Sequence, residues 1–98
     1  MATSKNYKDF ILEQLSLLEN IKCKPMMGEF LLYYSGILFG GIYDNRLLLK
    51  RTLSNKKYNM PEQLPYNGAK PMYFVEDVDN KELLGEIVQA TYDGLSKK

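Results

Sequence analysis

The sequence predicts an α+β fold, a two-layer sandwich in which an antiparallel sheet carries an N-terminal and a C-terminal helix. Apolar residues recur at helical spacing near both ends of the 98-residue chain, whereas apolar runs rich in aromatic and branched residues fill its middle. Pairs of turn-forming residues separate these runs, as they do in a strand meander. Helices that flank such a meander pack on one face of its sheet. We expect residues 1–98 to form a single domain, because a chain of this length supports one hydrophobic core.

The first expected element is a helix near the N-terminus. Its buried face is a stripe of apolar residues at spacings of four, four and three, namely Tyr7, Ile11, Leu15 and Leu18. Thr3 or Ser4 can supply the N-cap, because a hydroxyl oxygen accepts a hydrogen bond from the first helical turn. Asn20 and then Pro25 are expected to close this helix, since the residue before a proline avoids the helical region.

Three strands are expected next, at residues 29–34, 37–43 and 46–52. Ser35-Gly36 and Asp44-Asn45 separate them and predict tight hairpin turns, because Gly, Asn and Asp tolerate positive φ. Asp44 is expected to accept backbone hydrogen bonds in its turn, and Lys50 to end an edge strand that its charge protects from aggregation.

The Gly40-Gly41 pair lies inside the second of these strands. Neither a helix start nor a Gly-Lys-Ser ending follows the pair, so it fails the tests for a phosphate loop or a dinucleotide site. The pair therefore predicts a strand bend or a β-bulge.

A long loop and a final strand and helix complete the expected fold. Residues 52–69 are the most polar stretch and predict a loop with a helical turn near its start. Residues 70–75 return to strand character, and Pro71 favours an edge strand or a strand start. Asp79 is expected to open the last helix, at capping-box spacing from Glu82. The buried stripe of that helix is expected at Leu84, Ile87, Val88, Thr91 and Leu95.

Composition argues against several classes of function. Thirteen basic and twelve acidic residues leave a net charge of +1, without the bias of a dedicated nucleic-acid or anionic-membrane binder. The chain has no histidine, the commonest general base and metal ligand, so we expect no catalytic residue, no metal site and no cofactor. Residues 30–43 are apolar but too short to span a bilayer as a helix, so no membrane contact is expected. The N-terminus lacks the apolar core of a signal peptide, and the mature protein is expected to begin at Met1.

Cys23 is the single cysteine and cannot form an internal disulfide, which fits a reducing compartment, so a cytoplasmic location is expected. Lys22 and Lys24 beside it could lower its pKa, but no second thiol or histidine completes a redox or protease pair. We therefore interpret Cys23 as a small hydrophobic residue rather than a nucleophile.

Two segments, Asp44-x-x-Leu47-x-x-Lys50 and Gly68-Ala69-Lys70-Pro71, resemble a known family when they occur in this order. Together with the run Met26-Met27-Gly28-Glu29, where the family often has Met-Phe-Gly-Gly, they resemble the N-terminal domain of the TfoX (Sxy) competence regulators. The likeness extends over nearly the whole chain. Its matched positions, which we interpret as structural, are Met26, Gly28, Asp44, Leu47, Lys50, Gly68, Ala69, Lys70 and Pro71.

The resemblance implies a fold with the order α-β-β-β-α-β-β-α, akin to secretion chaperones. Full-length TfoX regulators carry a second, C-terminal domain and act with the cyclic-AMP receptor protein. This chain stops at Lys98, so we expect a short stand-alone member without that domain. The resemblance implies the fold more firmly than it implies competence regulation.

One local cluster of cations, with tyrosines interleaved, stands out in the second half of the chain. Together with the start of the following strand it forms the expected interaction surface: Lys50, Arg51, Lys56, Lys57, Tyr58, Tyr66, Lys70, Met72 and Tyr73. Clustered lysines belong more often to a solvated loop than to a binding site. Tyr33, Tyr34, Tyr43 and Tyr73 are interpreted as sheet packing rather than as a ligand box.

These observations favour a non-enzymatic regulatory or protein-interaction module. Its partner is expected to be a protein, with a second copy of the chain in a homodimer as one candidate, docked on an unpaired strand edge that begins at Lys70. The alternative is a nucleic-acid-associated factor that uses the Lys50–Lys70 surface, with direct DNA binding that is weak and salt-sensitive. A small-molecule-binding or enzymatic domain is a third hypothesis, for which the sequence offers no motif.

Overall fold

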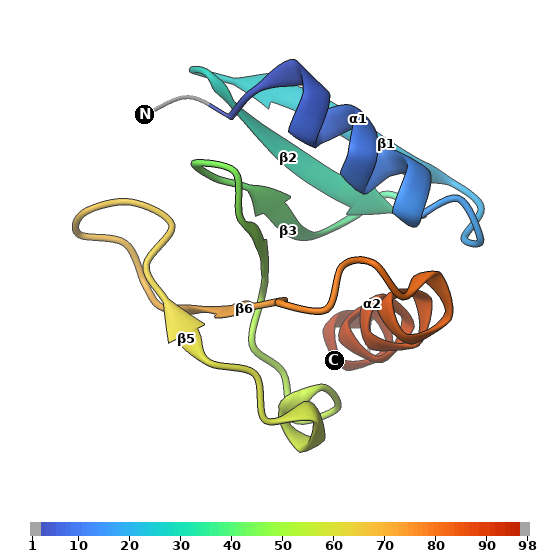
Figure 1. The fold of residues 1–98 in the computed structure, drawn as a ribbon. Helices are drawn as coiled ribbons and strands as arrows, with labels where there is room; N and C mark the ends of the chain where they lie inside the picture. Colours follow the sequence, from blue (N-terminus) through green and yellow to red (C-terminus); the bar gives the residue numbers. More distant parts are fainter. Residues whose placement is uncertain (1–2, 97–98) are drawn as a thin grey trace.

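A computed structural model describes residues 3–96 as two helices, six strands and one short 3-10 helix (Figure 1). In chain order these are α1 (Lys5–Gln14), β1 (Ile21–Met26), β2 (Glu29–Tyr34), β3 (Ile37–Ile42), β4 (Leu47–Leu49), the 3-10 helix η1 (Lys56–Tyr58), β5 (Glu62–Gln63), β6 (Met72–Phe74) and α2 (Lys81–Ser96). The strands form one antiparallel sheet in the order β1-β2-β3-β4-β6-β5. The predicted α+β class, with a helix before and after an antiparallel sheet, is confirmed.

The order of elements differs from α-β-β-β-α-β-β-α in two places. β1 is an additional strand before the first expected one, and the expected middle helix is reduced to the three residues of η1. η1 ends where Asn59 adopts a left-handed φ of 54°, and Pro61 follows two residues later. A left-handed residue ends a helix and a proline prevents its continuation, so the turn cannot lengthen.

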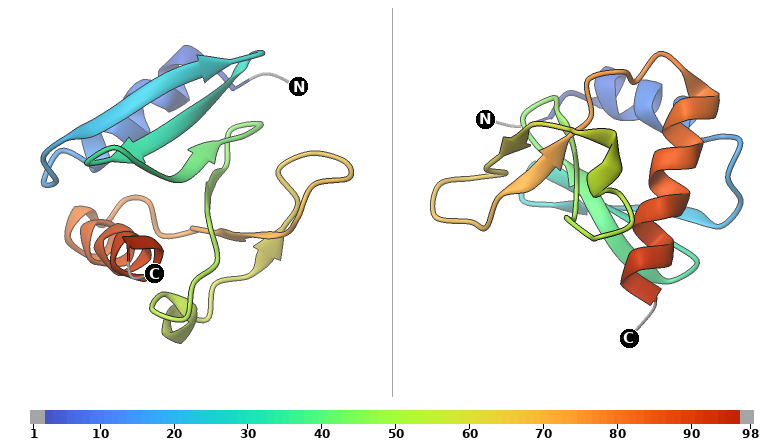
Figure 2. Two further views of the ribbon diagram at one scale, coloured as in Figure 1. Left: turned by 180° about the vertical axis from the view of Figure 1, so that it is seen from behind. Right: turned by 90° about the horizontal axis from the view of Figure 1, so that it is seen from below.

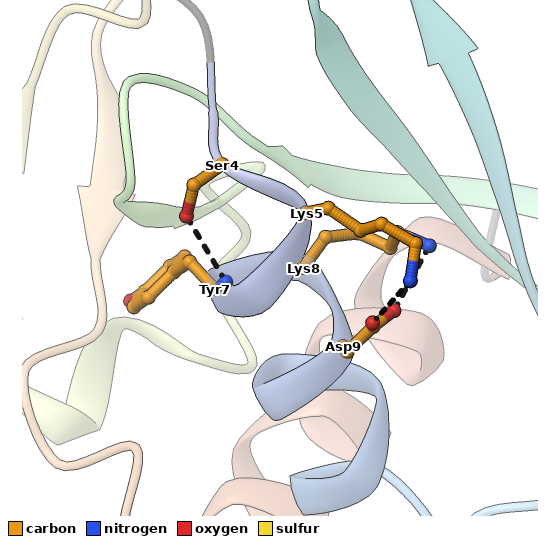
Figure 3. A network of polar contacts seen from close by, with 5 residues as sticks. All are labelled: Ser4, Lys5, Tyr7, Lys8 and Asp9. Carbon is orange, nitrogen blue, oxygen red and sulfur yellow. Dashed lines mark hydrogen bonds and ion pairs between the residues drawn. The ribbon is translucent and has the colours of Figure 1, made fainter.

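Ser4 is the N-cap of α1, one of the two predicted candidates. Its Oγ accepts a hydrogen bond from the backbone N–H of Tyr7 at 3.1 Å, as Figure 3 shows. The same view shows Lys5 and Lys8 pairing with the carboxylate of Asp9, at 2.9 and 3.0 Å. Lys5 and Asp9 are exposed, whereas 21% of the Lys8 side chain is exposed. Ion pairs with exposed members contribute little stability, and the cap fixes where the helix begins.

The predicted end of this helix is wrong, because α1 stops at Gln14 and Leu15 is its C-cap. Asn20 adopts a left-handed φ of 64° and turns the chain into β1. β1 then pairs with β2 along its whole length. Pro25 is tolerated there because β1 is an edge strand, where the missing N–H can face away from the ladder. Pairing with β2 therefore overrides the helix-ending signals of this segment.

The hairpin turn predicted at Asp44-Asn45 is confirmed. Both residues have positive φ, 52° and 57°, and Tyr43 and Arg46 exchange backbone hydrogen bonds of 2.9 and 3.0 Å across them. This is the type I′ geometry whose twist matches that of the flanking strands. The predicted turn at residues 35–36 is also present, and a turn of the same kind that was not predicted joins β1 to β2 at Met27-Gly28.

A cluster of hydrogen bonds ties the start of α1 to this turn. Glu29 Oε1 accepts from the backbone N–H and the hydroxyl of Thr3, at 3.1 and 2.6 Å, and from the N–H of Asp44 at 3.0 Å. Asn45 Oδ1 accepts from the N–H of Ser4 at 3.0 Å. Among residues 3–96 no hydrogen bond to the Asp44 carboxylate is present, and the side chain of Asn45 is the acceptor in this turn.

The sheet edges differ from those predicted. β4 lies between β3 and β6, so Lys50 does not end an edge strand. β6 lies between β4 and β5, so the strand after Lys70 is paired on both sides, and Pro71 marks a strand start. The two-residue strand β5 causes this change, because it folds back from the long loop onto β6. The edges of the sheet are β1 and β5.

Both helices pack on one face of the sheet and share its core. The buried side chains of this core come from α1 and its C-cap, from β2, β3 and β4, from the residue after β6, and from α2: Ile11, Leu15, Leu32, Phe39, Ile42, Leu47, Leu49, Val75, Leu84, Ile87 and Val88. The side chain of Gln14 donates to the carbonyl of Val78 at 2.7 Å and so links α1 to the entry of α2. The expected capping role of Asp79 is wrong, because α2 starts later and Asn80 Oδ1 accepts from the N–H of Leu83 at 3.1 Å.

Candidate functional site

A groove of about 780 Å³ is lined by sixteen residues, none of which belongs to α1 or α2. Its walls come from β3 and its exit, from the segment after β4, and from residues 65–73. The views in Figures 1 and 2 place α2 and the loop between β5 and β6 on opposite sides of β4. The groove is lined by residues of the strands and loops and by Lys56 of η1.

The structure brings together in this groove most of the interaction surface predicted from sequence. Seven of the nine candidates line it: Lys50, Arg51, Lys56, Tyr66, Lys70, Met72 and Tyr73. Lys56 lies some six residues beyond Lys50, and Lys70 fourteen further along the chain, so the fold of the loop unites residues from distant positions. We call the groove, with all the residues that line it, the Lys50–Lys70 groove.

The other two candidates, Lys57 and Tyr58, lie outside the groove. η1 turns Tyr58 toward α2, where its hydroxyl donates to the carboxylate of Glu86 at 2.6 Å. The ammonium of Lys57 lies 5.4 Å from the centre of the Tyr58 ring. The predicted surface is thus divided by a single turn of 3-10 helix, which sends Lys56 and Lys57 to different sides.

The Tyr58–Glu86 contact has a consequence for alkaline titration. Burial and the hydrogen bond to Glu86 raise the pKa of Tyr58 to about 12. Because this folded pKa exceeds the unfolded value of about 10, the contact stabilises the fold fully below that value and loses its effect as pH rises from there to about 12. When tyrosinate absorbance is followed as the pH rises, the ionisation at the highest pH should be that of Tyr58. Tyr58→Phe should remove this ionisation, and Glu86→Gln should move it to lower pH. If Tyr58→Phe leaves the last ionisation unchanged, another tyrosine carries it.

Sequence reasoning missed several groove residues. Tyr43 lies in the wall, with the centre of its ring 6.3 Å from that of Tyr66. Burial, helped by Tyr66 and Glu29, raises the pKa of Tyr43. Leu53 also lines the groove and is 90% exposed. A leucine isolated between polar residues in a loop is the signal that could have identified it.

Arg46 holds the outer wall of the groove in place. Its guanidinium donates to Gln63 Oε1 at 2.8 Å, to the carbonyl of Pro65 at 3.4 Å and to that of Tyr43 at 3.2 Å. These bonds join the hairpin turn after β3 to the start of the loop between β5 and β6. The loop that carries Tyr66 is thereby anchored at its base, although its tip is exposed.

The charges of the groove are mainly positive. Lys50, Arg51, Lys56 and Lys70 face one carboxylate, that of Glu62, which lies 3.4 Å from Arg51. The whole chain has a net charge of only +1, so the groove concentrates cations that the rest of the surface balances. Such a site attracts anions at short range and little beyond a Debye length.

The two sequence segments that carry the family resemblance also meet at the groove. Lys50 from the first segment and Ala69, Lys70 and Pro71 from the second line it. The remaining matched positions have structural surroundings: Leu47 is fully buried in the core, Met26 ends β1, and turns or loops hold Gly28, Asp44 and Gly68. The matched positions therefore divide into core or turn residues and residues of one concave surface.

Cys23 lies on β1 with its side chain against the core. Burial raises the pKa of its thiol, an effect that Lys8 opposes. The expected influence of Lys22 and Lys24 is not seen, because strand alternation places both on the exposed side.

We therefore expect Cys23 to react slowly. At neutral pH its alkylation by iodoacetamide should be about tenfold or more slower than that of free cysteine, because the thiolate is the reactive form and is scarce. The urea-unfolded chain should regain the ordinary rate. Cys23→Ser should fold and keep the cellular role of the protein; loss of that role in a folded variant would mean that the thiol has a function.

Within residues 3–96, no group of three or more Cys, Asp or Glu side chains is placed to hold a metal ion. In that same part of the chain, neither helix is long and apolar enough to cross a membrane.

Comparison with models of known protein families finds no match for this chain. A search of curated proteins finds a relative in Spirochaeta aurantia, the uncharacterized 12.7 kDa protein in the trpE 5′ region. The two are 32% identical over 80 residues, which cover 80% of this chain and 70% of the relative. Identity at this level over most of both sequences is the mark of common descent, and the chain belongs to the family of the uncharacterized 12.7 kDa protein of Spirochaeta aurantia.

Proposed function

We propose that this protein is a non-enzymatic regulatory module of the TfoX N-terminal type, which acts in the cytoplasm by binding another protein at the Lys50–Lys70 groove. The observation that carries the proposal is the groove itself. The two segments of the resemblance meet there, and cations and aromatic side chains from distant parts of the chain share one concave surface. Shared surfaces of this kind serve recognition more often than packing.

The chemistry of the described residues supports binding rather than catalysis. The sequence has no histidine, and burial raises the pKa of the single thiol, which leaves no activated base or nucleophile of the usual types. In residues 3–96 every buried side-chain nitrogen and oxygen has a hydrogen-bond partner within the fold.

Part of the groove has the composition of a protein interface, whereas its three lysines are of a type that is depleted there. Tyrosine, arginine and methionine are enriched at such interfaces, and the groove contains all three, with Tyr66 61% exposed and Leu53 90% exposed. Both side chains line the groove and are open to solvent. A protein partner would bury both.

The proposal is tested by site-specific photo-crosslinking in the native cell. A benzophenone amino acid replaces Tyr66, in the groove, or Met27, which is 98% exposed in the turn between β1 and β2. We expect position 66 to give a defined covalent adduct with one protein, whose purified form then binds the unmodified chain. Adducts that are equally frequent at both positions, or none at position 66, would contradict the proposal.

The alternative function, nucleic-acid association, is favoured by the proximity of four cations and the exposed Tyr66 ring. Four phosphate contacts at most give binding that is weak and falls steeply with salt. A mobility-shift titration from low to physiological salt tests it. Tight DNA binding that persists at physiological salt and disappears in Lys56→Glu/Lys70→Glu would replace the protein-binding proposal.

A further inference from the structure

We propose that the occupant of the Lys50–Lys70 groove is a short acidic segment of the partner that also carries an apolar or aromatic side chain. This inference rests on the proposed function and names the chemistry of the partner. Three features of the groove argue for it: unpaired cations, exposed apolar side chains beside them, and a small volume.

The unpaired cations indicate an anionic occupant. Of the four groove cations, only Arg51 has an ion-pair partner among residues 3–96, namely Glu62. Lys50, Lys56 and Lys70 are all exposed and have no carboxylate within pairing distance in that part of the chain. Carboxylates of a bound segment can pair with these ammonium groups without displacing an internal contact.

The apolar side chains indicate that charge is not the whole of the recognition. Leu53 and Tyr66 are exposed beside the lysines, whereas Tyr43 and Tyr73 are 7% and 9% exposed and form the wall behind them. A purely anionic ligand would leave Leu53 and Tyr66 in water. A segment that alternates acidic and apolar residues satisfies the lysines and covers these two side chains together.

The volume indicates a short segment. At about 780 Å³ the groove lies in the range of about 300–1,000 Å³ that is typical of sites for small ligands. The whole molecule measures 31 × 30 × 24 Å, and an extended peptide advances about 3.3 Å per residue. About eight residues would therefore cross the molecule from side to side, which bounds the length of the bound segment.

A peptide fits these features better than a nucleic acid. The carboxylate of Glu62 lies in the groove and partly neutralises Arg51, which disfavours a row of phosphates there. A duplex or a single strand would also gain little from the rest of the chain, whose total charge is +1. A peptide can instead place its few carboxylates only where the lysines are.

The test uses fluorescence anisotropy with a labelled synthetic peptide of about eight residues that alternates Glu with Phe and Leu, a length set by the extended rise per residue. Two matched peptides accompany it, one with Lys in place of Glu and one with Ser in place of Phe and Leu. A labelled oligothymidylate of similar length supplies the nucleic-acid arm. All are measured at about 0.15 M ionic strength, where long-range attraction is screened.

The chain offers a closely matched control variant. Lys56→Glu/Lys70→Glu reverses two groove charges, whereas Lys57→Glu/Lys22→Glu reverses two exposed charges outside the groove. Lys56 and Lys57 are neighbours in sequence, and both double variants change the net charge of the chain equally. A difference in binding between them therefore reports the position of the charges and not the net charge.

We expect saturable binding of the acidic-apolar peptide with a dissociation constant below about 1 mM, weakened about tenfold or more in the groove variant and less than about twofold in the control. The lysine and serine peptides should bind at least about tenfold more weakly than the parent. The inference is overturned by equal losses in both variants, by no saturable binding, or by tighter binding of oligothymidylate. If the peptide fails while the crosslink at position 66 yields a partner, only this inference falls; if the crosslink fails as well, the proposed function falls with it.

Discussion

Asn55→Ala is expected to lower the free energy of unfolding by about 3 kcal/mol, because it removes the centre of a buried polar network. Asn55 is fully buried, with 0% exposure. Its Oδ1 accepts from the N–H of Thr52 at 2.9 Å, and its Nδ2 donates to the carbonyl of Lys50 at 3.0 Å and to Thr91 Oγ1 at 2.8 Å. The alanine would leave these three partners without their bond and a cavity beside them.

The size of the effect follows from how little else can satisfy these groups. Each buried donor or acceptor left unpaired costs about 1–3 kcal/mol. The network also joins the segment after β4 to α2, which carries Thr91, so its loss should loosen the wall of the groove as well as the fold. Asn55→Asp should cost at least as much, because a carboxylate cannot donate to the carbonyl of Lys50.

Urea unfolding followed by circular dichroism measures this effect. The control is Asn67→Ala, an exposed asparagine in the loop between β5 and β6, which should change the free energy of unfolding by less than about 0.5 kcal/mol. A loss below about 1 kcal/mol for Asn55→Ala would show that water replaces the amide, and that the segment after β4 is less firmly held than its hydrogen bonds indicate.

The strands that sequence predicted correctly are those with strong local signals. Residues 29–43 combine aromatic and branched runs with turns that need positive φ, and the structure has β2, β3 and their turn there. β1 was missed because its residues include two lysines and Pro25, which read as a polar end to a helix. Its place in the sheet depends on pairing with β2, a tertiary contact that composition does not reveal.

The candidate site was predicted in part, for a similar reason. A cluster of lysines with interleaved tyrosines is visible in sequence, and seven of the nine chosen residues do share the groove. The division between Lys56 and Lys57 depends on the direction of η1. The inclusion of Tyr43 depends on the loop between β5 and β6, which places the ring of Tyr66 6.3 Å from that of Tyr43. The prediction of an unpaired strand edge beginning at Lys70 failed for the same reason. The two-residue strand β5, which pairs with β6, is too short to be recognised in the sequence.

Gly40→Ala is expected to destabilise the protein by about 3 kcal/mol or more, since it places a Cβ where two strands are already in contact. A Cβ at Gly40 would lie 3.0 Å from Leu49 Cα and closer still to the carbonyl oxygen of Leu48, both on the neighbouring strand β4. These are backbone atoms in the middle of the sheet, and Gly40 pairs directly with Leu49. They cannot move aside as the end of a flexible side chain could, so the strands must separate.

The close approach has a local cause that agrees with the predicted bend. The pairing of β2 with β3 shifts register between Leu32 and Tyr33, where Leu32 faces Gly40 and Tyr33 faces Leu38. The extra residue on β3 is Phe39, which is fully buried. A bulge of this kind increases the local twist and turns β3 toward β4, which brings Gly40 against the Leu48 carbonyl. Gly40 also lines the groove, so the strand that bends here shapes the groove wall.

The matched control is Gly85→Ala on α2. A Cβ there would meet only the Leu18 side chain, at 3.9 Å, an ordinary van der Waals contact. Because alanine favours a helix interior over glycine by about 1 kcal/mol, Gly85→Ala should raise the free energy of unfolding by about that amount. Urea denaturation of both variants should therefore give changes of opposite sign from the same chemical substitution. If Gly40→Ala is neutral, the strands around the bulge can part without cost, and the groove wall built on them is not the rigid surface that selective binding of an acidic segment requires.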